Sequence, residues 1–149
     1  MTRKTDGGFL ISQTKQIQGR VFEKLLSKAG IQEFNGAQGR ILYVLWQEDL
    51  VPIFELSKKT GLAKTTLTSM VDRMEQSNLV VRVFDKKDRR QIRIALTDKA
   101  KSLQCEYENI SAKMTEIFYK GFNNNEIDTF ESMLGKIIKN LTEVENESN

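Results

Sequence analysis

The 149-residue sequence contains no histidine and a single cysteine, Cys105. Without histidine, the chain has neither a Ser-His nor a Cys-His pair for nucleophilic catalysis, and no metal site that includes histidine. One cysteine can form neither an internal disulfide nor the several thiolate bonds of a structural zinc site. The composition therefore predicts no catalytic residues, no metal ligands and no cofactor, and we expect that the protein is not an enzyme.

Long hydrophobic segments are also missing. No run of about 18 apolar residues exists, so no membrane-spanning helix and no membrane partner are expected. The N-terminal stretch MTRKTDGGFLISQTKQ has no apolar signal-peptide core. Together with the single cysteine, these absences predict a cytoplasmic location.

The sequence has one proline, which disfavours long irregular segments and favours helix. Apolar residues three and four positions apart predict a first helix over residues 9–29. Asn35 can cap a second helix, in which RILYVLW is apolar on nearly every side and is predicted to be buried. Pro52 suits the first turn of a third helix, IFELSKKT, and Gly61 suits its left-handed end.

The stretch that begins with the third helix has the features of a helix-turn-helix. After a turn of about three residues, a fourth helix is predicted over residues 63–77, with its apolar side chains on one side. Its other side carries small polar residues, which suit the major groove of DNA because hydroxyls reach base edges and phosphates without holding the helix away. An ordinary helical hairpin with solvated threonines is the alternative. The predicted DNA contacts are Lys64, Thr65, Thr66, Thr68, Ser69 and Arg73.

Two short strands are predicted directly after this helix, over residues 79–84 and 92–96, where apolar and polar residues alternate. A helix-turn-helix followed by a hairpin is a winged helix, and the loop DKKDRR forms the tip of the wing. Crowding cations there destabilises the loop unless an anion approaches, and arginine suits the narrow minor groove. Asp88 is expected to hold an arginine rotamer; a plain solvated turn is the alternative. The predicted wing contacts are Lys86, Lys87, Asp88, Arg89 and Arg90.

Positive charge is concentrated in the middle of the chain. The net charge is +3, but residues 57–93 hold ten Lys and Arg against four Asp and Glu, a balance of +6. Residues 1–56 hold seven against six, or +1, and residues 94–149 hold six against ten, or −4. A basic middle between a neutral start and an acidic end predicts a polyanionic partner for the middle segment. A helix with a solvated face is the simpler alternative.

The last third of the sequence predicts two more helices. Thr97 can cap a fifth helix, whose apolar positions alternate by threes and fours from Ala100 to Gly121, as in a helix packed lengthwise against another. Asn123 and Glu126 form a capping-box pattern for a sixth helix. The predicted fold class is therefore mainly α with a small β-hairpin, in which a winged helix-turn-helix lies between N- and C-terminal helices.

The segment from about 36 to 98 resembles the winged helix of the MarR (multiple antibiotic resistance regulator) family. The resemblance rests on GAQGRILYVL, on FELSKKTGLAKTTLTSMVDRMEQSNLVVR and above all on DKKDRRQIRIALT. It implies one domain over residues 1–149, with a winged lobe at 36–98 and a helical dimerisation lobe at 9–29 and 98–144. Two chains would interlock through this helical lobe.

The resemblance also implies roles for single residues. The segment from Lys64 to Arg73 would be the recognition helix, and Arg90 would enter the minor groove with Asp88 supporting it. Three features depart from the family pattern: Ala63 stands where a capping serine is frequent, Asn78 replaces the usual glycine, and the reactive N-terminal cysteine of the hydroperoxide-sensing branch is missing.

From this resemblance we expect a repressor that binds double-stranded DNA as a homodimer on a pseudo-palindromic operator and responds to a small-molecule effector or another signal. A winged-helix module that binds protein or RNA without an operator is the alternative. A ligand-binding protein without DNA function is a further alternative, but it leaves the basic wing unexplained. The candidate effector pocket comprises four aromatic residues, for which a place in the plain core is the alternative: Phe9, Tyr43, Trp46 and Phe54.

Overall fold

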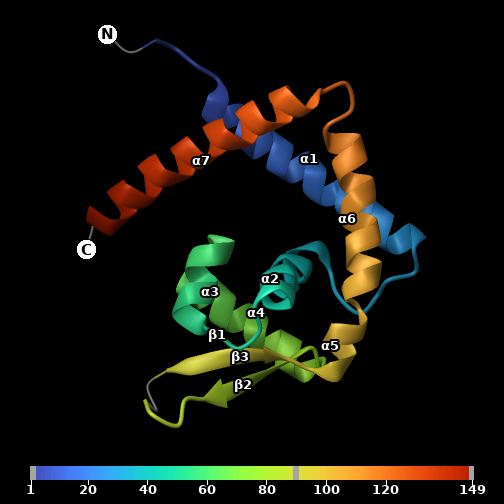
Figure 1. Cartoon of the computed structure of the whole chain (residues 1–149), viewed down its shortest axis with the longest axis vertical. Coiled ribbons are helices and arrows are strands. Elements are labelled where there is room, and N and C mark those ends of the chain that lie inside the picture. The colour runs from blue at the N-terminus through green and yellow to red at the C-terminus, as the bar shows by residue number, and fades with distance from the viewer. Residues whose placement is uncertain (1–2, 89–90, 148–149) are drawn as a thin grey trace. The chain divides into compact units, whose positions relative to one another are not determined.

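The computed structural model describes residues 3–88 and 91–147. The predicted fold class is confirmed, because the described elements are mainly helices with one small antiparallel sheet (Figure 1). Tertiary contacts divide the chain into two compact units, Met1–Ala112 and Lys113–Asn149. The elements in chain order are α1 (Gly7–Lys28), α2 (Gly36–Gln47), β1 (Val51–Pro52), α3 (Ile53–Thr60), α4 (Lys64–Gln76), β2 (Val80–Phe84), β3 (Ile92–Leu96), α5 (Asp98–Ser102), α6 (Gln104–Phe118) and α7 (Asn124–Glu147).

The sheet has three strands in the order β1-β3-β2, one more than the predicted hairpin. The hairpin register pairs Val80 with Leu96, and β1 adds a pair between Val51 and Ile94 on the other side of β3. A two-residue strand is too short to produce an alternating pattern, so the sequence did not reveal it. Pro52 ends this strand and lies at the N-cap of α3. The prediction that it lies in the first turn of this helix is therefore wrong by one position.

Local capping patterns gave most helix ends correctly. Asn35 and Gln38 form a complete capping box at the start of α2, and Thr97 accepts from the backbone N–H of Ala100 at the start of α5. Gly61 ends α3 with a φ of 74°, and Asn78 takes the left-handed conformation with a φ of 61° after α4. Asparagine is among the few residues that tolerate this conformation, so it replaces glycine here without breaking the turn.

The predicted fifth helix is wrong in one respect, because it is split into α5 and α6 at Leu103. There the backbone N–H donates to the carbonyl of Ala100, three residues back, instead of four. One turn is thereby tightened, a change that side-chain periodicity does not detect. The apolar stripe continues across the break, because Ala100, Leu103, Tyr107 and Ile110 are all buried.

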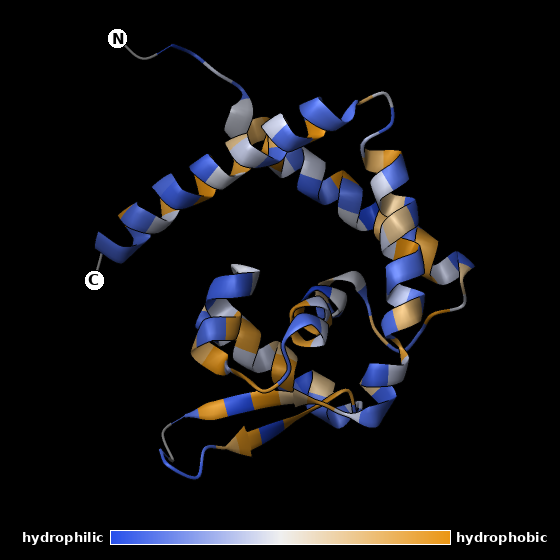
Figure 2. Ribbon diagram, viewed as in Figure 1, coloured by the Kyte–Doolittle hydropathy of each residue, from blue (hydrophilic) through white to orange (hydrophobic). Residues whose placement is uncertain are grey.

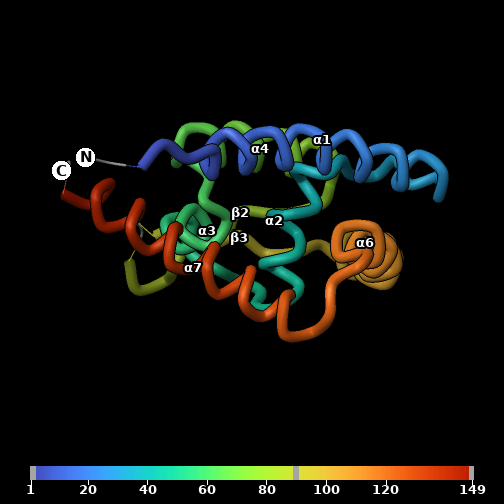
Figure 3. The backbone as a smooth tube through the Cα atoms, turned by 90° about the horizontal axis from the view of Figure 1, so that it is seen from above, coloured from blue at the N-terminus to red at the C-terminus, as the bar shows by residue number. Residues whose placement is uncertain are grey.

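Tyr107 of α6 lies at the centre of an aromatic cluster in the first unit. Its ring centroid is 5.0 Å from that of Trp46 and 6.0 Å from those of Phe22 and Phe34. Burial raises the pKa of its hydroxyl, since the charged form would lose its hydration. In Figure 3, α1 runs across the picture and α6 is seen nearly along its axis. The cluster therefore connects α1, α2 and α6.

Apolar residues remain exposed on the long helices near both ends of the chain. In α7, none of the described residues is buried, although apolar residues recur along its length (Figure 2). Of the helices in the described part of the chain, none is long and apolar enough to cross a membrane. The exposed apolar residues are Phe9, Leu10, Ile11 and Ile17 in α1, and Met133, Ile137, Ile138, Leu141 and Val144 in α7.

Candidate nucleic-acid interface

Helix α4 has one buried face and one exposed polar face. Leu67, Val71 and Met74 are completely buried and anchor the helix in the core. The six side chains predicted to contact DNA all lie off this buried face, where Thr68 is half-buried and the others are exposed: Lys64, Thr65, Thr66, Thr68, Ser69 and Arg73. The structure thus gathers the predicted residues on one accessible surface of a fixed helix.

The N-cap residue of α4 is Ala63, which has no side-chain oxygen to cap the helix. The first-turn N–H groups and the positive end of the helix dipole favour an anion at this position. Lys64 is exposed at the same end and adds a full positive charge. A DNA phosphate is one anion that such a helix end can bind.

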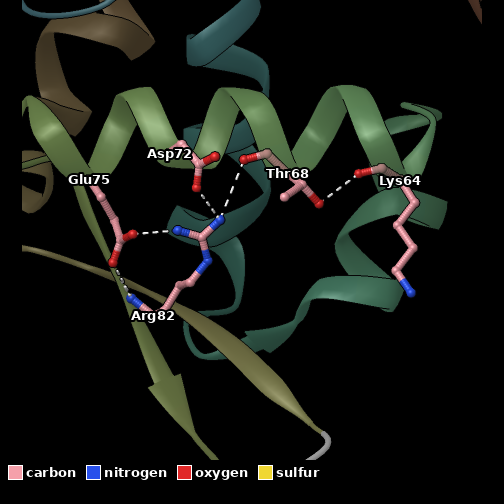
Figure 4. Close-up of polar contacts among 5 residues, drawn as sticks. All are labelled: Lys64, Thr68, Asp72, Glu75 and Arg82. Atoms are coloured by element: carbon pink, nitrogen blue, oxygen red, sulfur yellow. Dashed lines mark hydrogen bonds and ion pairs between the residues drawn. The ribbon is translucent and has the colours of Figure 1, made fainter.

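The hydroxyl of Thr68 is already engaged within the helix. It donates to the carbonyl oxygen of Lys64 at 2.8 Å, so its proton is not directed outward (Figure 4). In this rotamer the side chain offers a methyl group and oxygen lone pairs, which suit apolar or donor groups on a base edge. Thr68 therefore differs from the more exposed hydroxyls of Thr65 and Ser69.

The hairpin of β2 and β3 projects past the helices in Figure 1 and leads into the wing loop. At the start of the loop, Asp85 accepts from the backbone N–H of Lys87 at 2.8 Å and lies 3.6 Å from Nε of Arg93. The pKa of the Asp85 carboxyl is held below its usual value, mainly by the bond from the Lys87 N–H. The N–H of Asp88 and the Arg93 guanidinium lower this pKa further. Lys86 and Lys87 are exposed beside this turn.

Two predicted wing contacts, Arg89 and Arg90, lie outside the described residues, and so does the proposed support of Arg90 by Asp88. Asp85 and Arg93 were not among the predicted site residues. An Asp two residues before a turn amide is a recognisable local signal, so Asp85 could have been predicted. Arg93 could not, because its Nη1 donates at 3.0 Å to the carbonyl of Leu50, which is 43 positions away.

The candidate effector residues are only partly brought together. Tyr43 and Trp46 both pack against Tyr107, and Nε1 of Trp46 donates to the carbonyl of Ala100 at 3.0 Å. The simple alternative, a place in the core, holds for Trp46. It is wrong for Phe9, Tyr43 and Phe54, whose exposed fractions are 70%, 49% and 50%.

The sequence model of the MarR family matches residues 34–92, which span α2, the helix-turn-helix and the start of β3. Among curated proteins, the chain is 30% identical over 98 residues to the HTH-type transcriptional regulator MgrA of Staphylococcus aureus, covering 66% of this chain and 65% of MgrA. It is 36% identical over 86 residues to the HTH-type transcriptional regulator TtmR of Methylorubrum extorquens, covering 58% of this chain and 43% of TtmR. Over its winged helix-turn-helix, the chain matches the MarR family. It spans less than two thirds of the length of either relative.

Solved structures of MarR family members show the same fold over nearly the whole chain. A MarR transcriptional regulator from Methanosarcina mazei Go1 superposes with a TM-score of 0.79 at 24% identity, covering 95% of this chain and 99% of that one. A mutant MarR from E. coli complexed with operator DNA superposes with a TM-score of 0.76 at 23% identity, covering 87% of this chain and 91% of that one. Reduced AbfR bound to DNA superposes with a TM-score of 0.70 at 25% identity, covering 89% of this chain and 88% of that one. The family fold therefore includes the helices on both sides of the winged helix.

Proposed function

We propose that this protein is a sequence-specific transcription regulator, most simply a repressor, that binds double-stranded DNA through α4 and the wing. The observation that carries the proposal is the accessible face of α4, where six hydroxyl and basic side chains gather on a helix whose other face is buried. The basic sequence of the loop after β2 adds further positive charge. Such a surface attracts phosphates and leaves short side chains within reach of base edges.

We further propose that the protein acts as a homodimer. The exposed apolar residues of α1, and separately those of α7, are surfaces that a second copy would cover, and pairing of identical surfaces about a two-fold axis is the commonest assembly. In this proposal, residues 36–98 form the DNA-binding lobe, while residues 9–29 and 98–144 form the dimerisation lobe. Two recognition helices would then occupy successive major grooves of a pseudo-palindromic operator.

A small-molecule effector is part of the same proposal. The exposed ring of Tyr43 beside Trp46 and Tyr107 provides an aromatic surface in the first unit. A ligand that binds better to a state with wrongly spaced recognition helices would shift the population away from DNA. We also propose a cytoplasmic location, where the single exposed Cys105 would stay reduced.

Selection of bound duplexes from a random DNA pool tests this function. We expect enrichment of a two-fold symmetric site, which a dimer with two recognition helices requires. A pool without any enriched site would contradict the proposal. If the protein then dimerises and binds protein or RNA instead, the alternative of a winged-helix interaction module without an operator is supported.

A further inference from the structure

Arg82 of β2 joins the wing to α4 through a set of hydrogen bonds (Figure 4). Its Nη1 donates to Oε1 of Glu75, and its Nη2 donates to Oδ1 of Asp72 at 2.7 Å and to the carbonyl oxygen of Thr68 at 3.4 Å. Its backbone N–H donates to Oε2 of Glu75 at 3.1 Å. One residue of the edge strand is therefore bound to three residues of the helix.

The three acceptors share one side of α4, because Thr68, Asp72 and Glu75 are four and three residues apart. The planar guanidinium presents several N–H donors in a fixed fork, which a lysine ammonium cannot reproduce. The Arg82 side chain is only 19% exposed, and its bonds to Glu75 and to the Thr68 carbonyl are partly buried, whereas its bond to Asp72 is exposed. Charge-assisted bonds in such surroundings hold two elements in a defined orientation.

Asp72 also stands on the face of α4 that is proposed to meet DNA. Seven residues make nearly two full turns, so Asp72 lies within about 20° of Thr65 around the helix axis. Its carboxylate is 58% exposed, and a negative charge at this place repels phosphates. Arg82 offsets that charge and holds the carboxylate on the side of α4 that faces β2.

We propose that Arg82 is a positioning residue for DNA recognition, which fixes the exposed face of α4 relative to the wing by binding Asp72 and Glu75. The role rests on the proposed function, since it requires α4 and the wing to meet the same duplex. A small rotation of α4 against the wing would misplace base contacts but leave the attraction to phosphates intact. Arg82 therefore determines the ratio of specific to nonspecific affinity more than the affinity for DNA in general.

The test compares Arg82→Lys with wild type on the selected duplex and on a scrambled duplex of equal length and composition. Lysine keeps the charge but loses the fork, so we expect the ratio of the two affinities to fall about tenfold. Affinity for the scrambled duplex and the slope of binding against salt should stay within about twofold of wild type. Melting curves establish that the compared proteins are folded.

A second experiment compares two carboxylates, one that binds Arg82 and one that does not. Glu75→Gln and Glu33→Gln remove one negative charge each, and simple electrostatics predicts slightly tighter binding for both. We expect Glu75→Gln to lower the ratio of specific to nonspecific affinity and Glu33→Gln, in the turn before α2, to leave it unchanged. The double variant Arg82→Lys/Glu75→Gln should be no worse than Arg82→Lys, because both changes break the same link.

The outcomes separate this role from the function on which it rests. Wild type that selects a symmetric site, with Arg82→Lys showing an unchanged ratio, overturns the positioning role and leaves the proposed function standing. Wild type that selects no site overturns both. If Arg82→Lys does not fold, Glu75→Gln decides, and a ratio equal to that of Glu33→Gln overturns the role.

Discussion

The winged region and α7 place their apolar residues in opposite surroundings. In α4, Leu67, Val71 and Met74 are completely buried, whereas in α7 Ile138 and Leu141 are exposed. Both helices carry apolar residues at spacings of three and four, so this periodicity predicts an apolar face but not what covers it. In the winged region, residues 36–98, the apolar face of α4 is buried within one chain. The apolar residues of α7 would be buried by the second chain of the proposed dimer.

A charge on the exposed apolar stripe of α7 should have the largest effect. Leu141 is 65% exposed, so Leu141→Glu should change the stability of a monomer by less than about 0.5 kcal/mol. In the proposed dimer the same charge would be buried, and we expect dissociation with a loss of operator affinity on the order of 100-fold or more.

The matched control is Ser132→Glu, which adds the same charge at an exposed position two and a half turns earlier, on the opposite side of α7 from Leu141. Sedimentation equilibrium measures the oligomeric state of both variants. A Leu141→Glu protein that stays dimeric and binds the operator would remove α7 from the dimer interface.

The two faces of α4 should separate stability from binding. Leu67→Ala leaves a cavity in the core, and we expect a loss of about 2–5 kcal/mol in the free energy of unfolding. Thr65→Ala, on the exposed face, should change that free energy by less than about 0.5 kcal/mol while costing about 1–3 kcal/mol of specific DNA affinity. Urea unfolding and duplex titration give the two quantities. Equal effects of Thr65→Ala on the selected and the scrambled duplex would argue against base contact by this residue.

A glycine in the core tests how tightly the winged region is packed. A Cβ added at Gly39 in α2 would lie 2.9 Å from Cε2 of Tyr107, a ring held by its aromatic neighbours. Overpacking should lower the free energy of unfolding by about 1–3 kcal/mol, while replacing glycine in a helix should raise it by about 1 kcal/mol. We therefore expect Gly39→Ala to destabilise the protein.

Gly19→Ala in α1 provides the control for that substitution. The added Cβ meets no described atom of this chain within 4 Å, so the helical gain should remain and the variant should be slightly more stable. Chemical denaturation of both variants checks the sign of each change. A stabilised Gly39→Ala protein would show that the aromatic cluster yields easily.

The smallest expected effect lies in the second unit, at a hydrogen bond between α7 and the turn before it. Tyr119 donates to Oε2 of Glu131 at 2.6 Å, and burial together with this bond raises the pKa of Tyr119 to about 12. A raised pKa means that the bond contributes stability fully below the ordinary value near 10 and loses it as pH rises toward 12. The difference in melting temperature between wild type and Tyr119→Phe should therefore shrink over this interval. A difference that stays constant to pH 12 would contradict this contribution.

Local signals predicted the helix ends well, whereas contacts between distant segments were not predictable. Asn35, Thr97 and Asn78 act within a few residues of their own positions, so their roles followed from short patterns. The bonds from Arg82 to α4 depend on how β2 packs against that helix, which no spacing along the chain specifies. The exposed face of α4 followed from its helical period, but the carboxylate of Asp72 on that face was overlooked.

In the proposed function, two copies of this chain bind one duplex through a basic surface. Titrating the selected duplex with protein over a range of salt concentrations tests both parts of this proposal. We expect two chains per duplex and an affinity that falls with salt, with a log–log slope on the order of −0.9 for each phosphate contact. Binding of a single chain, or an affinity that does not change between low and high salt, would contradict it.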